Sequence, residues 1–87
     1  GGGLSGRWNW VNVIYDFVQI GNAFTWTVVG NPEIGKGTVS GDGVQATWGP
    51  DGTGSAGTGR ITQRSAAGDA VRIEWNNGVV MTRNPPR

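Results

Sequence analysis

Apolar and polar side chains alternate along three stretches of the chain, NAFTWTVV at 22–29, GVQATW at 43–48 and AVRIEW at 70–75. An alternation with a period of two places the apolar side chains on one face of an extended strand and the polar side chains on the other. This pattern is typical of antiparallel strands with one solvated face. Each stretch reaches a tryptophan through the same alternation, and these residues are Trp26, Trp48 and Trp75.

Each stretch follows a turn signal that has another candidate strand on its other side. The turns IGN, SGDG and SAAGD are built from small and polar residues that favour turns. The strand candidates before them are IYDFVQI at 14–20, GKGTVS at 35–40 and GRITQR at 59–64. The sequence therefore predicts three hairpins that pack against one another and bring their tryptophans to a shared interior.

Two further strands are predicted near the ends of the chain. GRWNW at 6–10 has the composition of a first strand, and VVMTR at 79–83 is the last. The last strand is joined to the stretch at 70–75 through Asn77-Gly78, the dipeptide that suits a tight type I′ hairpin turn.

Two connections link the predicted hairpins. The segment 29–35 contains Pro32, which lacks a backbone N–H and suits a connection better than a central strand. The glycine-rich segment 49–59 is predicted to be the longest and most flexible connection, and it lacks the Lys-Ser/Thr ending of a phosphate-binding loop.

These elements predict an all-β fold, an antiparallel up-and-down meander of about eight short strands closed or nearly closed into a small barrel. A β-sandwich is the alternative. We expect a flexible segment over residues 1–6, a single barrel domain over 7–83 and an extended tail over 84–87, which contains consecutive prolines.

Composition narrows the function classes. The 87 residues contain five tryptophans but no cysteine and no histidine. There is thus no disulfide framework or thiolate metal site, and the commonest general base is missing. We predict no enzyme activity, no cofactor and no metal site. The formal net charge of +1 is too small for a nucleic-acid partner, and no apolar run approaches the ~20 residues of a membrane span.

The charged residues are expected to be structural. Asp42, Asp51 and Asp69 lie beside glycines in turn phrases, and Asp16 is expected on the outer face. For four of the arginines in the last part of the chain, an anion-binding patch and a solvated cross-strand charge ladder with Asp69 and Glu74 are both open, the ladder being favoured. These arginines are Arg60, Arg64, Arg72 and Arg83.

The aromatic residues carry the candidate site. Trp26, Trp48 and Trp75 either fill the core or line a pocket for one small ligand, which is the most that a barrel of this size holds. Trp8 and Trp10 share a face, so both point inward or both form an exposed platform for a sugar ring or a protein. The candidate ligand-binding residues are Trp10, Tyr15, Trp26, Trp48 and Trp75.

The phrase LSGRWNW at 4–10 resembles the Gly-x-Trp opening strand of the calycin group, the lipocalins and avidins. The resemblance implies a small ligand-binding β-barrel. It does not carry over biotin binding, because Trp10 stands at the position expected for the biotin-facing Asn of avidins. A similar fold serves bacterial metalloprotease inhibitors that insert an N-terminal trunk, a role that residues 1–6 would fill.

Three functional hypotheses follow. The first is a non-enzymatic barrel that binds a small ligand at its mouth. The second is a surface-recognition module for carbohydrate or protein, including a protease-inhibitor-like role. The third is a structural or homo-oligomeric module. The compartment stays open, with a secreted or periplasmic bacterial location as our expectation.

Overall fold

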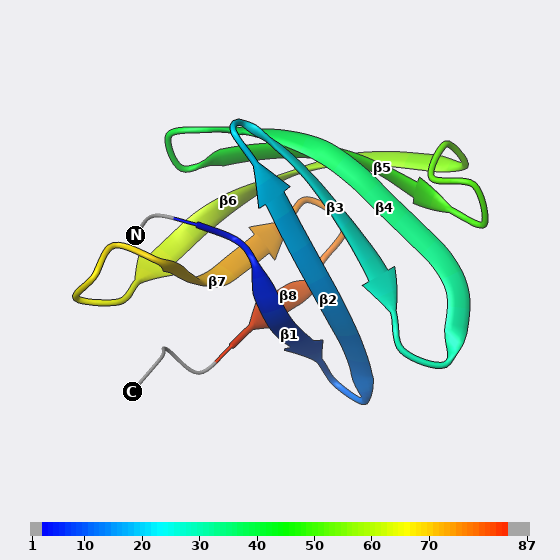
Figure 1. The fold of residues 1–87 in the computed structure, drawn as a ribbon, viewed down its shortest axis with the longest axis horizontal. Helices are drawn as coiled ribbons and strands as arrows, with labels where there is room; N and C mark the ends of the chain where they lie inside the picture. Colours follow the sequence, from blue (N-terminus) through cyan, green and yellow to red (C-terminus); the bar gives the residue numbers. More distant parts are fainter. Residues whose placement is uncertain (1–2, 84–87) are drawn as a thin grey trace.

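The computed structural model describes residues 3–83, which form eight antiparallel strands joined by short turns (Figure 1). The strands follow one another in chain order: β1 (Gly6–Trp10), β2 (Val13–Ile20), β3 (Ala23–Val28), β4 (Asn31–Ser40), β5 (Gly43–Gly49), β6 (Ser55–Arg64), β7 (Ala70–Trp75) and β8 (Val80–Thr82).

The sheet closes into a barrel, because each strand pairs with the next in sequence and β8 returns to pair with β1. Where the sheet closes, Asn9 of β1 pairs with Thr82 of β8. The predicted all-β meander and its closure are thus confirmed, and the sandwich alternative is wrong. The architecture is compatible with a small calycin-like barrel. No helix long and apolar enough to cross a membrane occurs within residues 3–83.

Large rings and glycines share the interior of the barrel in a regular way. Strands β3, β5 and β7 contribute aromatic and aliphatic side chains, and the strands between them present glycines at the facing positions. Gly35 on β4 pairs with both Trp26 and Trp48, and a Cβ added to Gly35 would overlap the Trp26 ring. A Cβ at Gly57 on β6 would lie 2.6 Å from the Trp48 ring, and one at Gly59 would lie 3.1 Å from the Trp75 ring. These inward-facing glycines therefore provide the space that the tryptophans fill.

The connection predicted at 29–35 is largely strand, because β4 begins at Asn31. The pairing shifts from Thr27 opposite Ile34 to Val28 opposite Asn31, which leaves Pro32 and Glu33 without partners on β3. A bulge accommodates a residue that cannot donate to the ladder, and this is how Pro32 enters a strand.

The connection predicted at 49–59 is also shorter than expected. Ser55–Gly59 belong to β6 and pair with β5, so the loop is confined to residues 50–54. Gly57 and Gly59 led the sequence analysis to predict a flexible loop. In the structure they are paired strand residues that face tryptophan rings.

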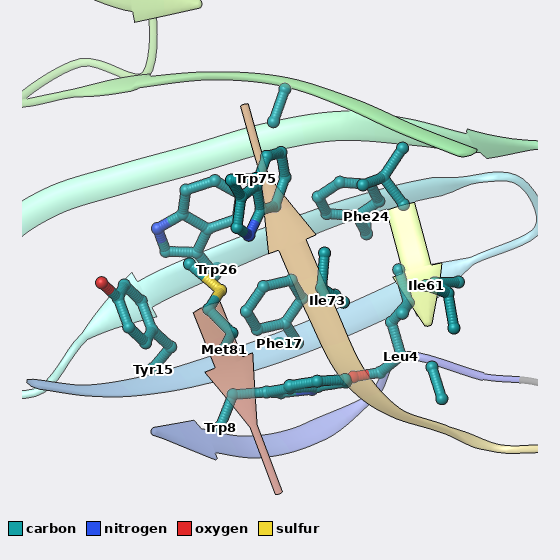
Figure 2. Packing of buried hydrophobic residues seen from close by; sticks show 13 residues of the cluster. Leu4, Trp8, Tyr15, Phe17, Phe24, Trp26, Ile61, Ile73, Trp75 and Met81 are labelled. Carbon is teal, nitrogen blue, oxygen red and sulfur yellow. The ribbon is translucent and has the colours of Figure 1, made fainter. Parts of the chain in front are cut away.

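One end of the barrel is closed by Leu4, which is fully buried ahead of β1. The Leu4 N–H donates to Gln19 Oε1 at 2.7 Å, and its carbonyl accepts from Trp8 Nε1 at 2.8 Å. Figure 2 shows Leu4 and Ile61 at one end of the buried cluster and Tyr15 at the other. Of the segment 1–6 that we expect to be flexible, residues 1–2 lie outside the described residues, as does the predicted tail over 84–87.

Arg83 holds this closed end together. Its guanidinium donates to the carbonyls of Ala70 at 2.6 Å and of Gly3 at 2.7 Å, and also to those of Leu4 and Ser5. The same group lies 4.7 Å from the centre of the Trp8 ring. Burial lowers the pKa of Arg83 from its usual value. One side chain therefore ties the N-terminal segment to β7 and to the chain after β8.

Candidate functional site

The opposite end of the barrel keeps a cavity of about 230 Å³. The turns β1–β2, β3–β4 and β7–β8 and the loop β5–β6 surround this end. Most of the wall is aromatic and comes from five different strands: Trp10, Tyr15, Trp26, Trp48 and Trp75. These are the five residues that the sequence nominates as candidates, and the structure brings all of them to one cavity. That they bind a ligand stays a prediction.

The three tryptophans of the predicted hairpins meet as expected. The ring centre of Trp26 lies 6.1 Å from that of Trp48 and 5.8 Å from that of Trp75, and Trp48 and Trp75 are 6.0 Å apart. Trp26 and Trp75 are 2% and 6% exposed, whereas Trp48 is half-buried. Core filling and pocket lining are therefore not alternatives here, because the same rings do both.

Trp8 and Trp10 both point inward, but they serve different ends of the barrel. Trp8 is fully buried beneath Arg83, so it cannot belong to an exposed platform. Trp10, two residues further along β1, is half-buried and lines the cavity. The prediction that Trp8 and Trp10 share a face is confirmed. The alternative, in which both point outward and form an exposed platform, is wrong.

Polar groups in the cavity are few. The lining includes one carboxylate, Glu33, and one amide, Asn77, alongside the aliphatic Val79 and Met81. Glu33 has the same inward parity along β4 as the glycines 35 and 37, and the bulge places it at the cavity. Sequence reasoning missed Glu33, although its two-residue spacing from the inward glycines is a usable signal.

Tyr15 belongs to the aromatic wall and interacts electrostatically with the carboxylate of Glu33. Its ring stands edge-on to Trp26, with the planes at 88° and the centres 6.2 Å apart. Burial raises the pKa of Tyr15 to about 12, and the negative charge of Glu33 adds to the effect. The phenol therefore stays protonated near neutral pH, next to a carboxylate of the cavity.

Two indole N–H groups have no partner within residues 3–83. Trp26 Nε1 and Trp75 Nε1 are both buried, and no described residue accepts a hydrogen bond from either. A buried donor without an acceptor costs about 1–3 kcal/mol. In contrast, Trp8 Nε1 at the closed end is bonded to Leu4. The orphaned donors are thus confined to the tryptophans that line the cavity.

The remaining charges lie mostly outside the barrel. Asp16 is on the outer face, as predicted, and pairs with Arg7 at 3.0 Å. Arg72 pairs with Glu74 at 3.2 Å, but both lie on β7, so this ion pair runs along one strand and not across two strands as predicted. Arg60 on β6 is exposed.

Arg64 and Arg83 also depart from the predicted ladder. Arg64 pairs with Asp42 of the β4–β5 turn at 2.9 Å, and Arg83 is the partly buried clamp described above. Asp69 accepts from the Gly3 N–H at 3.2 Å instead of pairing with an arginine. Asp51 has the predicted turn role, since its Oδ1 accepts from the N–H and hydroxyl of Thr53.

A broader depression of about 490 Å³ lies over the polar faces of β4–β6. Threonines and glycines dominate its lining, and its one charged residue is Lys36. It offers no ring and no convergent polar set, so the aromatic cavity is the better site. Residues 3–83 contain no cluster of three or more groups suited to hold a metal ion.

Comparison of the chain with family models, with curated proteins and with solved structures found no match in any of the three. The functional argument therefore depends on the geometry of the cavity.

Proposed function

We propose that this protein is a non-enzymatic binding module that takes a small ligand, or one group of a larger molecule, in the aromatic cavity at the open end of the barrel. The observation that carries the proposal is the asymmetry of the two ends. Leu4 and Arg83 seal one end, whereas the other keeps an aromatic-walled cavity of about 230 Å³.

The character of the wall supports this role. Binding sites for small molecules are mostly apolar and aromatic, with a few placed polar groups. Here five aromatic residues accompany Glu33 and Asn77. The cavity is smaller than the ~300–1,000 Å³ of sites for drug-sized ligands. A compact ligand, or a single group on a longer molecule, therefore fits this cavity better than an extended one.

The rings are also held in place before any ligand arrives. Trp26 lies over Gly35, stacks on Phe17 at 5.2 Å between ring centres and meets Trp75 edge to face at 5.8 Å. A preorganised wall reduces the conformational entropy that binding would otherwise cost. The small size of the barrel thus favours binding, because four of the five cavity rings, all except Trp10, pack against another ring.

The two other hypotheses have less support. A module built by strand pairing between subunits needs a free sheet edge, and each of the eight described strands has a neighbour on both sides. An exposed aromatic platform needs outward rings, and Trp8, Trp10 and Tyr15 all point into the barrel.

Amide and indole NMR spectra of the ¹⁵N-labelled protein test the proposal. We would record them with a set of small neutral, cationic and anionic compounds. The five tryptophans supply five indole N–H signals, of which Trp8 at the closed end is an internal reference. Binding should shift the Trp10 and Trp48 indole signals and leave Trp8 unchanged.

Two rim substitutions sharpen this test. Val79→Trp adds bulk to a residue that lines the cavity and should abolish the shifts. Val29→Trp makes the same change in the neighbouring β3–β4 turn, at an exposed residue outside the lining, and should leave them intact. The proposal fails if no compound shifts the Trp10 and Trp48 signals, or if Val79→Trp and Val29→Trp bind alike.

A further inference from the structure

We infer that the ligand of this cavity is an organic ammonium ion with methyl groups on its nitrogen, held against the aromatic walls with Glu33 as its counter-charge. This inference deepens the proposed function and rests on it. Three features of the cavity carry it: the angles between the rings, the sign of the charge and the scarcity of hydrogen-bonding groups.

Three of the four ring pairs in the cavity wall meet at steep angles, and the fourth, Trp26 and Trp48, is inclined at 35°. Trp75 meets Trp26 at 63° and Trp48 at 74°, and Tyr15 meets Trp26 at 88°. A flat aromatic ligand favours a parallel slot in which it can stack, whereas rings at steep angles enclose a compact, rounded group. Ring faces carry negative electrostatic potential, and tryptophan attracts cations most strongly. The wall therefore suits a methylated ammonium group by shape and by potential.

Among residues 3–83, Glu33 is the only charged residue in the lining. No Lys or Arg within residues 3–83 forms an ion pair with it, since the three ion pairs of that region join Arg7 to Asp16, Arg64 to Asp42 and Arg72 to Glu74. The charge of Glu33 reaches the Tyr15 phenol, where it contributes to the raised pKa. A carboxylate among rings attracts a cation and repels an anion.

Arg83, a cation packed partly into the barrel, lies at its other end. Arg83 lies over Trp8 and donates to the carbonyls of Gly3 and Ala70, so it is committed to the seal. Arg83 thus places its positive charge at the closed end and Glu33 its negative charge in the cavity, while Lys36 packs beside Gly52 of the β5–β6 loop, outside the lining. A cationic group is therefore the ligand charge that complements the cavity.

A sugar is a poorer occupant. Sugar hydroxyls need several donors and acceptors, and apart from the indole N–H groups the polar side chains of the lining are Glu33, Asn77 and the Tyr15 hydroxyl. The indole N–H groups of Trp26 and Trp75 are buried, so a ligand in the cavity would not reach them without movement of the rings. A methylated ammonium makes no such demand, because it binds through ring faces and charge.

The deciding experiment compares choline with 3,3-dimethylbutan-1-ol, in which carbon replaces the charged nitrogen at nearly the same shape. Titrations are followed by the Trp10 and Trp48 indole signals. Choline should bind at least about tenfold more tightly than the neutral alcohol, which is the ratio expected for a desolvated cation–π contact.

Glu33→Gln should reduce choline affinity about fivefold or more and leave the affinity for the alcohol unchanged. Glu74→Gln removes a carboxylate from the exposed outer face and is the matched control, which should bind choline like the parent protein.

Each contrary result has a distinct meaning. Equal binding of choline and the alcohol would overturn the charge inference and leave the cavity as a binding site. If Glu33→Gln binds choline as tightly as the parent protein, Glu33 is not the counter-charge and the inference is overturned. A third outcome is that choline causes no shift, although other small compounds shift the Trp48 signal and Val79→Trp abolishes those shifts. This outcome would overturn the ammonium assignment alone. No response to any compound would overturn the proposed function as well.

Discussion

The two ends of this barrel are built from the same kinds of strand and differ in how their polar groups are satisfied. At the closed end, Arg83 donates to four backbone carbonyls and Trp8 Nε1 has a partner. At the open end, Trp26 Nε1 and Trp75 Nε1 have no partner within residues 3–83, and Glu33 forms no ion pair there. The polar groups of the closed end are satisfied within the protein, whereas the open end keeps unpaired ones, of which Glu33 lines the cavity.

The comparison implies that stability and binding are divided between the ends. Substitutions at the closed end should unfold the protein, whereas substitutions at the open end should change the cavity at a smaller cost in stability. The following expected effects run from the largest to the smallest.

Arg83→Ala should lower the free energy of unfolding by about 3–5 kcal/mol, because it removes charge-assisted hydrogen bonds to partly buried carbonyls and the guanidinium that packs over Trp8. Urea unfolding followed by tryptophan fluorescence measures this loss. Arg7→Ala, which breaks an exposed pair with Asp16 on the outer face, is the control and should cost less than about 1 kcal/mol. Similar losses in the two variants would contradict the role of Arg83 as a clamp.

Leu4→Ala should cost about 3 kcal/mol, since it empties a fully buried site at the closed end. Trp10→Ala removes a larger side chain, but one that is half-buried beside the cavity, and it should cost less. Thermal unfolding of both variants gives the order. If Trp10→Ala were the more damaging change, the open end would be essential to stability and the proposed division would be wrong.

Gly35→Ala should cost about 2 kcal/mol, because the added Cβ overlaps the Trp26 ring and forces the cavity wall to move. Gly43→Ala on the next strand is the matched control, since its Cβ would meet its nearest neighbour at 3.5 Å, an ordinary contact. Chemical denaturation reports the difference, and the Trp26 indole signal should shift only in Gly35→Ala.

Stability should fall by about 1–2 kcal/mol as the pH rises from 10 to 12, on account of Tyr15. Its pKa is raised to about 12 by burial and by Glu33, so the unfolded chain loses this proton at lower pH than the folded protein does. The contribution is fully present below pH ~10 and is lost through pH ~12. Tyr15→Phe should flatten this part of the stability profile, and an unchanged slope would exclude Tyr15 as its source.

The strands and their inward faces could be predicted from the sequence because they depend on local alternation. Phe24, Trp26, Ala46 and Ile73 are all buried by the parity that their stretches show. Closure could be predicted as well, since a meander with one apolar face has few other ways to bury it.

What could not be predicted depends on contacts between distant parts of the chain. Arg83 is separated by 80 residues from Gly3, whose carbonyl it binds, and no local pattern marks that pairing. Leu4 precedes the first strand, so its burial follows from the closed end as a whole. Glu33 reaches the cavity because of a bulge in β4. The neighbouring Pro32 favours turns, so the sequence predicted a connection where the structure has a strand.

The seam between β1 and β8 bears on how the protein is made. Every other strand pairing joins neighbours in sequence, so the hairpins can zip up one after another as the chain leaves the ribosome. Only the emergence of Thr82 and Arg83 allows the first strand to gain its second neighbour. Until then the growing sheet exposes an unpaired edge at each side, so the pairing of β8 with β1 is the step that removes the edges at which another chain could pair.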